Sequence, residues 1–207
     1  MPDPQSATIK KIAIVILAAG ASTRLGTAKQ LLKAKDSQTL LKHAATTALS
    51  TNCRPVVVVL GASHETIAKE LSGLDLFIAV NAQWQTGIAS SVKCGLQEVL
   101  RLQADTDALI FMVCDQPYVT TALLEALVIR YKASGKTIVA SRYDEATGTP
   151  ALFDHTFFPL LERLEGDKGA LKLIHQFPDR LGLVPFTEGI FDIDTAEDYR
   201  RYSGKEE

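Results

Sequence analysis

Three short runs of almost uninterrupted apolar residues constrain the fold more than any other feature of the sequence. They span residues 12–17, 55–60 and 108–113, and weaker runs occupy residues 76–80 and 137–140. Continuous apolar runs without polar alternation are typical of parallel strands that are buried on both faces of a sheet. The sequence therefore predicts a mostly parallel sheet that contains these runs.

Segments of helical length separate the apolar runs. Residues 39–50, 64–71, 88–102 and 121–132 each carry apolar side chains at the spacing of one helix face. Strands that alternate with helices in this way form right-handed crossover units. We therefore expect an α/β fold, a doubly wound three-layer sandwich in which a twisted, mostly parallel sheet lies between two layers of helices.

The alternation becomes looser after Gly148. Residues 149–153, 181–185 and 190–193 resemble short strands, and residues 171–175 resemble a short helix. We find no linker rich in glycine, serine or proline and no internal repeat that would divide the chain. We therefore expect one domain over residues 1–207, with flexible ends at about residues 1–10 and 203–207.

The charge balance argues against several classes of partner. The chain has 22 basic and 24 acidic residues and a formal net charge of −2, without the basic surplus of a dedicated nucleic-acid binder. Its longest apolar run, residues 12–20, is far shorter than a membrane-spanning helix of roughly 20 residues. The 3 cysteines show no paired spacing, which favours a reducing compartment. We expect a cytoplasmic protein that binds neither nucleic acid nor a membrane.

The segment after the first apolar run has the composition of a phosphate-binding loop. Residues 17–29 read LAAGASTRLGTAK, in which small residues that let the backbone approach a ligand precede two cations. Accessible backbone N–H groups and fixed positive charges both stabilise anionic oxygens. The segment lacks the lysine placement of a Walker A loop and the G-x-G-x-x-G of a dinucleotide fold. The alternative is a plain connector that exposes Arg24 and Lys29.

Acidic residues follow two of the predicted strands. Asp115 lies just after the run at residues 108–113, where a carboxylate is a suitable ligand for a divalent cation or a simple helix cap. Asp192 and Asp194 lie on the same face if their segment is a strand. Either Asp194 or Thr195 caps the helix that follows. We favour Asp192 as the metal ligand and Asp194 as the cap, with Asp194 as the alternative ligand.

Two further segments carry polar groups suited to ligand recognition. Residues 81–91 combine amides, hydroxyls and glycine before a predicted helix, and suit hydrogen bonds to a base, a ribose or another polar edge. Trp84 within them either stacks on a ring or packs against the domain. The glycine-rich turn at residues 166–170 either presents Lys168 to an anionic ligand or is a capped turn.

Taken together, these segments resemble the molybdopterin nucleotidyltransferase-like, or MobA-like, family. The resemblance rests on LAAG-x-S-x-RLG-x-x-K at residues 17–29, DQP at 115–117, GD-x-GA at 166–170 and DIDT-x-ED at 192–198. With N-x-x-W-x-x-G-x-x-S at residues 81–90, the chain is most similar to the molybdenum cofactor cytidylyltransferase branch. The resemblance implies the Rossmann-like fold of nucleotide-diphospho-sugar transferases.

The resemblance also implies a reaction and a set of site residues. The reaction is transfer of CMP from CTP to the terminal phosphate of the molybdenum cofactor, with release of pyrophosphate and with Mg²⁺, or alternatively Mn²⁺, as cofactor. The catalytic residues are Arg24, Lys29 and Asp115, and the metal ligands are Asp115 and Asp192. The nucleotide-binding residues are Leu17, Ala18, Ala19, Gly20, Ser22, Gly26, Gly61, Asn81, Gly87, Ser90 and Ser91. The acceptor-binding residues are Gln116, Pro117 and Lys168. The implied partners are CTP, a phosphorylated acceptor and, as a client, a molybdoenzyme.

The nucleotide and the acceptor have defined alternatives. The methyl group of Ala19 narrows the space beside the base, which disfavours a purine and predicts CTP over GTP. The pair Lys29 and Gln30 resembles the methylerythritol phosphate cytidylyltransferases, which act on a different small phosphorylated acceptor. A third reading is a non-catalytic nucleotide-binding or cofactor-binding partner of a molybdoenzyme, because a fold and a pocket do not guarantee turnover.

Overall fold

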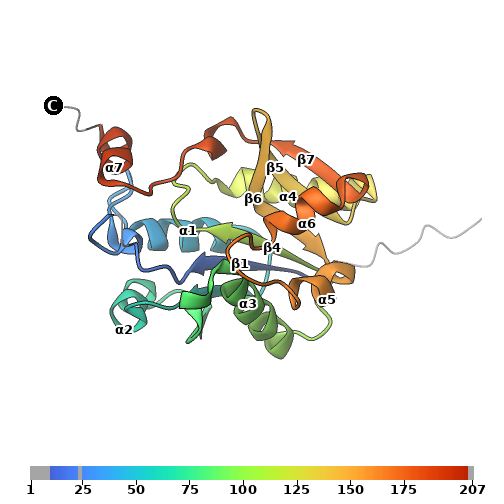
Figure 1. The fold of residues 1–207 in the computed structure, drawn as a ribbon, viewed down its shortest axis with the longest axis horizontal. Coiled ribbons are helices and arrows are strands. Elements are labelled where there is room, and N and C mark those ends of the chain that lie inside the picture. The colour runs from blue at the N-terminus through green and yellow to red at the C-terminus, as the bar shows by residue number, and fades with distance from the viewer. Residues whose placement is uncertain (1–9, 23–24, 205–207) are drawn as a thin grey trace, which may run out of the picture.

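The described part of the chain folds around a seven-stranded, mostly parallel sheet (Figure 1). The computed structural model describes residues 10–22 and 25–204. In spatial order the strands are β3 (Phe77–Val80), β2 (Val56–Leu60), β1 (Ile12–Ala18), β4 (Ala108–Val113), β6 (Ala146–Asp154), β5 (Ile138–Tyr143) and β7 (Leu181–Pro185). β6 runs antiparallel to both of its neighbours, β4 and β5, and the other pairings are parallel. The predicted fold class is confirmed.

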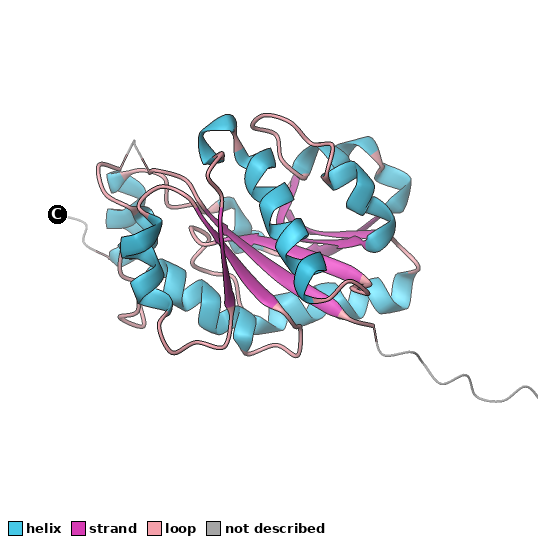
Figure 2. Cartoon of the chain, turned by 90° about the horizontal axis from the view of Figure 1, so that it is seen from below, coloured by secondary structure: helices cyan, strands magenta, loops and turns pink. Residues whose placement is uncertain are grey.

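Helices cover both faces of this sheet (Figure 2). One face carries α1 (Leu40–Leu49), α2 (His64–Ile67) and α4 (Thr121–Ser134). The other face carries α3 (Ile88–Leu102), α5 (Phe158–Leu161) and α6 (Leu171–Gln176). This arrangement is the expected three-layer sandwich.

Shorter elements connect and extend these layers. The 3₁₀ turns are η1 (Lys29–Leu31), η2 (Ala68–Leu71), η3 (Trp84–Thr86), η4 (His155–Phe157), η5 (Pro178–Arg180) and η6 (Thr187–Ile190). The last helix, α7 (Ala196–Ser203), is capped by Gly204 at its carboxyl end. Residues 1–9 and 205–207, within the ends expected to be flexible, lie outside the described residues. Across the described ranges, no helix is both long and apolar enough to cross a membrane.

The central position of β1 determines where a ligand can bind. Every residue of β1 is buried, and the strand pairs in parallel with β2 on one side and β4 on the other. Because these strands run in the same direction, the loops that follow them meet at one edge of the sheet. The loop after β1 and the turn after β4 therefore come together, although they are far apart in the sequence.

The predicted strand at residues 190–193 is wrong. Ile190 ends the turn η6, and residues 191–194 have no regular secondary structure. Ile193 donates its backbone N–H to the carbonyl of Asp115 at 3.0 Å, which anchors the segment at the turn after β4. Ile193 is fully buried and Asp192 is exposed, so the alternation that suggested a strand is present without strand pairing in this described segment.

The predicted cap of the last helix is also corrected. Thr195, not Asp194, caps α7, because its hydroxyl accepts the backbone N–H of Asp198 at 3.2 Å. The Asp198 carboxylate accepts the backbone N–H of Thr195 at 2.8 Å, which completes a capping box. Asp194 lies outside the helix, and its side chain is part of the site described below.

Close packing of α3 on the sheet gives a testable prediction. A Cβ atom on Gly95 would lie 2.4 Å from Val15 Cγ1 and 3.0 Å from Val59 Cγ2. The helix-propensity gain of Gly95→Ala is about 1 kcal/mol, whereas overpacking typically costs about 1–3 kcal/mol. We expect Gly95→Ala to lower the free energy of unfolding, measured by urea denaturation, despite the better helix former.

The matched control is the same substitution in a Val15→Ala background. Removing the two Val15 methyl groups opens the space into which the new methyl group would project. The cost of Gly95→Ala should therefore be smaller in that background. A Gly95→Ala protein that is more stable than the parent would contradict the packing argument.

Candidate active site

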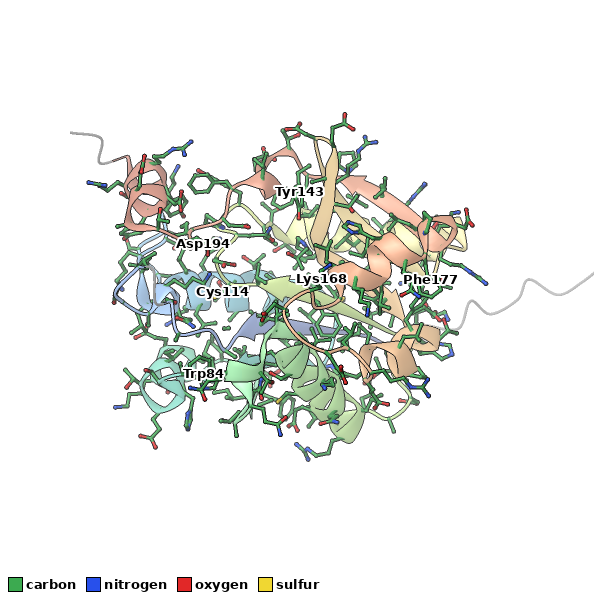
Figure 3. The ribbon with its side chains drawn as sticks, in the orientation of Figure 1. Trp84, Cys114, Tyr143, Lys168, Phe177 and Asp194 are labelled. Atoms are coloured by element: carbon green, nitrogen blue, oxygen red, sulfur yellow. The ribbon has the colours of Figure 1, made fainter. Side chains whose placement is uncertain are left out.

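A cavity of about 490 Å³ opens at the carboxyl ends of β1 and β4. Among the residues predicted to act in catalysis or nucleotide binding, its walls contain Leu17, Ala18, Ala19, Gly20, Lys29, Gly87, Ser91 and Asp115. The cavity is also lined by Trp84, Gln85 and Ile88 of the predicted recognition segment 81–91 and by Asp167 of the turn at 166–170. Gln30, Val113 and Cys114 line it as well, and sequence reasoning assigned them no role in a site. Figure 3 labels Cys114, Trp84 and Asp194 around this end of the sheet. The cavity therefore joins the loop after β1, the start of α3 and the turn after β4.

The loop after β1 is held in shape by the buried side chain of Gln30. Its amide nitrogen donates hydrogen bonds to the carbonyls of Ala18 at 2.8 Å and Gly20 at 2.9 Å. Ser22 adopts a left-handed backbone conformation with φ of 54°, and its hydroxyl accepts the backbone N–H of Lys29 at 3.0 Å. Gln30 thus turns two carbonyls toward the protein interior, which leaves the other side of the loop facing the cavity. In the sequence, the position of Gln30 directly after Lys29 was the only indication that this glutamine belongs to the site.

The ammonium group of Lys29 joins a carboxylate of the cavity wall, that of Asp115, to the carboxylate of Asp194, which does not line the cavity. It donates a hydrogen bond to Asp115 Oδ2 and another to Asp194 Oδ1, the latter at 3.0 Å. Burial lowers the pKa of Lys29, but the charge and hydrogen bond of Asp115 and the hydrogen bond of Asp194 together raise it well above its usual value. Lys29 is therefore a permanent cation that faces both the carboxylates and the cavity.

Asp192 adds a third carboxylate beside this pair. Although Asp192 as a whole residue is exposed, partial burial of its carboxylate and the like charge of Asp115 raise its pKa from 3.8 to about 6. A hydrogen bond from Gln116 and the charge of Lys29 lower the pKa but do not offset these effects. The site thus has an excess of negative charge that a single ammonium group does not neutralise.

The donor set fits a divalent cation shared with a phosphate ligand. Asp115 Oδ1 is buried and has no hydrogen-bond partner, although a buried carboxylate oxygen normally has one. In residues 10–22 and 25–204, no group of three or more His, Cys, Asp or Glu side chains is placed to hold a metal. Mg²⁺ commonly takes one or two protein carboxylates, with waters and substrate phosphates completing its shell. Asp115 with Asp192 or Asp194 therefore suits such an ion.

Several predicted nucleotide-binding residues contact the residues of the cavity wall without lining the cavity themselves. Asn81 donates to the hydroxyls of Ser90 at 2.8 Å and Ser91 at 3.0 Å, and of these three only Ser91 reaches the cavity wall. A Cβ atom on Gly61 would lie 2.6 Å from the Ala19 carbonyl and 2.7 Å from Trp84 Cβ. The absence of a side chain at Gly61 lets Trp84 pack beside the loop.

Other described residues of the prediction, among them the predicted metal ligand Asp192, are not part of this cavity wall. Ser22 and Gly26 are not part of its wall, and Arg24 lies outside the described residues. Gln116 and Pro117 are buried, and Gln116 donates to the Gly189 carbonyl at 3.3 Å. Lys168 is exposed and lines a second, adjoining cavity; Figure 3 labels it.

The cysteine in this wall is not placed for nucleophilic chemistry. Burial and the neighbouring charge of Asp115 raise the pKa of the Cys114 thiol to about 12. A thiol with such a pKa remains protonated near neutral pH, and the thiolate is the reactive form. The chemistry of the site therefore depends on its carboxylates, its ammonium group and its backbone.

The chain belongs to the MobA-like NTP transferase domain family, whose model matches residues 14–181. This confirms the resemblance at the level of the family. Its mostly parallel, Rossmann-like sheet is that of the nucleotidyltransferases, which confirms the expected fold type.

The chain is also similar to individual proteins, both in sequence and in solved structures. The chain is 29% identical to nicotine blue oxidoreductase of Paenarthrobacter nicotinovorans, over 90% of this chain and 94% of that protein. The crystal structure of Rv0371c from Mycobacterium tuberculosis H37Rv is 30% identical, with a TM-score of 0.81 over 95% of this chain and 100% of that chain. A manganese complex of Rv0371C has a TM-score of 0.78 at 27% identity, over 95% of this chain and 100% of that chain.

The raised pKa of Asp192 predicts a pH dependence of stability in metal-free protein. A carboxyl group whose pKa is higher in the folded than in the unfolded chain favours folding at low pH. That contribution is lost as the pH rises from the unfolded value of 3.8 to the folded value of about 6. In EDTA, we therefore expect Asp192→Asn to gain thermal stability relative to the parent between about pH 4 and pH 7.

The comparison uses melting temperatures of both proteins by calorimetry across that range. Asparagine cannot ionise, so it removes this titration while its size stays close to that of aspartate. If the two melting temperatures differ by the same amount at every pH, then burial and the charge of Asp115 do not raise the pKa of Asp192.

Proposed function

We propose that this chain transfers CMP from CTP to the terminal phosphate of the molybdenum cofactor and releases pyrophosphate, with Mg²⁺ as its metal. The observation that carries the proposal is the unpartnered, buried Oδ1 of Asp115 beside Lys29, in the wall of a cavity formed by a phosphate-binding type of loop. Membership of the MobA-like family supports nucleotidyl transfer as the class of reaction.

The reaction requires positioning and charge neutralisation more than proton transfer. An oxygen of the acceptor phosphate attacks the α-phosphorus of CTP, and the bond between that phosphorus and the bridging oxygen of pyrophosphate breaks. A phosphate monoester has a second pKa near 6, so its nucleophilic oxygen is already ionised near neutral pH. In-line positioning and stabilisation of charge then account for most of the catalysis.

We assign positioning and charge neutralisation to the following residues. The backbone of residues 18–20, held by Gln30, offers a close surface to the nucleotide. Lys29 supplies a fixed positive charge toward the triphosphate, and Arg24 is proposed to add a second. Asp115 and Asp192 would hold the metal, with Asp194 as the alternative second ligand. When bound, the metal supplies neutralisation of the charge on the phosphoryl oxygens.

A solved structure of a similar protein supports the metal assignment. The manganese complex of a similar protein supports a divalent cation in this family and leaves Mg²⁺ or Mn²⁺ as the metal here. We propose CTP and a phosphorylated small molecule as substrates, with a molybdoenzyme as client for the product. A cytoplasmic location suits these partners.

Two other activities remain as candidates. One relative is named nicotine blue oxidoreductase, which supports redox chemistry as a second candidate. The adjacent Lys29 and Gln30 support cytidylyl transfer to a smaller acceptor such as methylerythritol phosphate. Pyrophosphate release separates the classes, since nucleotidyl transfer produces pyrophosphate and a redox reaction or simple nucleotide binding does not.

The metal assignment is tested by Asp115→Asn. The substitution removes the negative charge while retaining most of the side-chain shape, so it should lower pyrophosphate release from CTP, Mg²⁺ and molybdenum cofactor by at least about 100-fold. Asp105→Asn is the matched control, because Asp105 is exposed and pairs with Lys11 away from the cavity. Near-normal turnover of Asp115→Asn would refute the assignment of Asp115 as a metal ligand. Tight CTP binding by the parent protein without pyrophosphate release would favour the non-catalytic partner.

The nucleotide preference is tested at Ala19. We expect the parent protein to use CTP better than GTP, and Ala19→Gly to reduce the ratio of the two kcat/KM values by about 10-fold, because a group of this size contributes roughly that much discrimination. Ala21→Gly is the control, since Ala21 lies in the same loop but not in the cavity wall. Equal use of GTP and CTP by the parent protein would contradict the preference.

A further inference from the structure

A cavity of about 570 Å³ opens between α7 and the segment that follows η1, and we call it the α7 cavity. α7 lies beside this segment in Figure 1. The backbone N–H groups of Lys33 and Lys35 donate to the hydroxyls of Tyr199 at 3.2 Å and Tyr202 at 3.0 Å, which joins the two sides. None of the residues that line the α7 cavity lines the cavity of the candidate active site. The α7 cavity is therefore a separate feature with walls that hydrogen bonds hold in place.

Three cations line the α7 cavity, which are Lys33, Lys35 and Arg201. Within residues 10–22 and 25–204, none of the three forms an ion pair with a carboxylate. The chain as a whole has a net charge of −2, so this concentration of positive charge is not a general property of its surface. Like charges that lie together repel one another, and a bound anion would offset that repulsion.

Two carboxylates on the same elements have partners of their own. The Asp36 carboxylate pairs with His43 Nδ1 at 2.7 Å and accepts the backbone N–H of Gln38 at 3.1 Å. The Asp198 carboxylate is held by Thr195 in the capping box of α7. The cations of the α7 cavity are thus left without a neutralising group from these two acids.

The tyrosines of the α7 cavity add hydroxyl donors to the three cations. Each hydroxyl accepts a backbone N–H, and among the described residues neither Tyr199 nor Tyr202 donates a hydrogen bond from its hydroxyl. Tyr202 is only 4% exposed, and burial raises the pKa of its phenol, which therefore keeps its proton near neutral pH. Because buried hydroxyl groups normally find hydrogen-bond partners, this proton is available to an acceptor in the cavity.

Aromatic rings fix the positions of two of the cations. The rings of Tyr118, Phe191 and Tyr202 pack against one another, with centroids between 5.7 and 6.4 Å apart. Lys35 Nζ lies 5.5 Å from the centroid of Tyr118 and 5.2 Å from that of Tyr202. The guanidinium of Arg201 lies 5.9 Å from the centroid of Phe191. These cation–π contacts hold both charges beside the cavity before any ligand arrives.

We propose that the α7 cavity binds a compact anion of the phosphate class, for which pyrophosphate is the probe, and that this anion holds α7 to residues 33–35. Lys33 and Lys35 contact the anion from one side, and Arg201 contacts it from the other. The inference goes beyond the proposed nucleotidyl transfer and does not rest on it.

The chemistry of the donors selects the phosphate class. A guanidinium group matches two oxygens of a phosphate with parallel hydrogen bonds. A phosphate group carries more than one negative charge near neutral pH and presents three acceptor oxygens, which suits several donors that surround one space. The remaining oxygens would be satisfied by the ammonium groups and the tyrosine hydroxyls.

Binding is tested by isothermal titration calorimetry of inorganic pyrophosphate into the full chain, in EDTA and a phosphate-free buffer. Without a divalent cation, the surplus of carboxylates at the candidate active site disfavours an anion there. We expect the parent protein to bind pyrophosphate at one site, and to bind malonate, a compact dicarboxylate, at least about 5-fold more weakly. No binding of pyrophosphate, or equal affinity for malonate, would overturn the inference.

A pair of adjacent arginines on α7 locates the anion. Arg201→Gln should weaken pyrophosphate binding at least about 10-fold, because it removes a charged hydrogen-bond donor from the cavity wall. Arg200→Gln removes the same charge at an exposed residue outside the cavity wall, and should change the affinity less than about 2-fold. Equal losses in the two variants would show general attraction to a basic helix and overturn the inference.

A lysine variant tests the other side of the cavity independently of α7. Lys33→Gln should also weaken pyrophosphate binding at least about 5-fold. Lys132→Gln is the matched control, because Lys132 is exposed on α4 and does not line the α7 cavity. Unchanged affinity in both Lys33→Gln and Arg201→Gln would place the anion elsewhere and overturn the inference.

Hydrogen exchange measured by mass spectrometry tests whether the anion holds α7. Pyrophosphate should slow amide exchange in residues 196–203 at least about 3-fold in the parent protein, and should leave exchange unchanged in Arg201→Gln. Pyrophosphate that binds without slowing exchange in these residues would not connect α7 to residues 33–35, and that result would overturn the inference.

Discussion

The contact of the Lys29 ammonium with Asp115 and Asp194 is the interaction on which the site depends. It joins segments that are 86 and 165 residues apart in the sequence, namely the loop after β1, the turn after β4 and the segment before α7. One positive charge faces three carboxylates when Asp192 is included, and the raised pKa of Asp192 reflects that imbalance. A divalent cation would offset the remaining negative charge, and a triphosphate would then bring its own charge to Lys29 and the loop.

The strands of the sheet position the loops, and the loops form the polar cavity. The buried strand β1 holds β2 and β4 in register on either side, which fixes the positions from which the loops leave the sheet. Gln30 then shapes one loop through two carbonyls, and the polar cavity forms beside it. The second cavity, which adjoins it, instead uses side chains of the core itself. The polar cavity is therefore lined mainly by loops, whereas much of the second cavity is lined by strands and helices.

The sequence predicts the sheet better than the details of the site, for physical reasons. Continuous apolar runs such as residues 108–113 suit buried strands and little else, so these strands are found where expected. Residues 190–195 are ambiguous locally, because Asp194 and Thr195 are both good caps and the alternation of Ile193 with acids suits a strand. A lysine 165 residues away binds Asp194, which no local pattern reveals. Gln30 acts through tertiary hydrogen bonds in the same way, and the second cavity consists of residues that read simply as core.

The small hydrophobic cluster beneath α7 has a consequence for the lifetime of the assembled site. Ala34, Leu40, Ile193 and Tyr202 form a cluster separate from the two large cores on the faces of the sheet. Elements with few buried contacts open more often than the core to which they are attached. Opening of this cluster would carry Asp192 and Asp194 away together while both sheet cores remain folded. The contact of Lys29 with Asp194 would then form in a local equilibrium that is distinct from the folding of the domain.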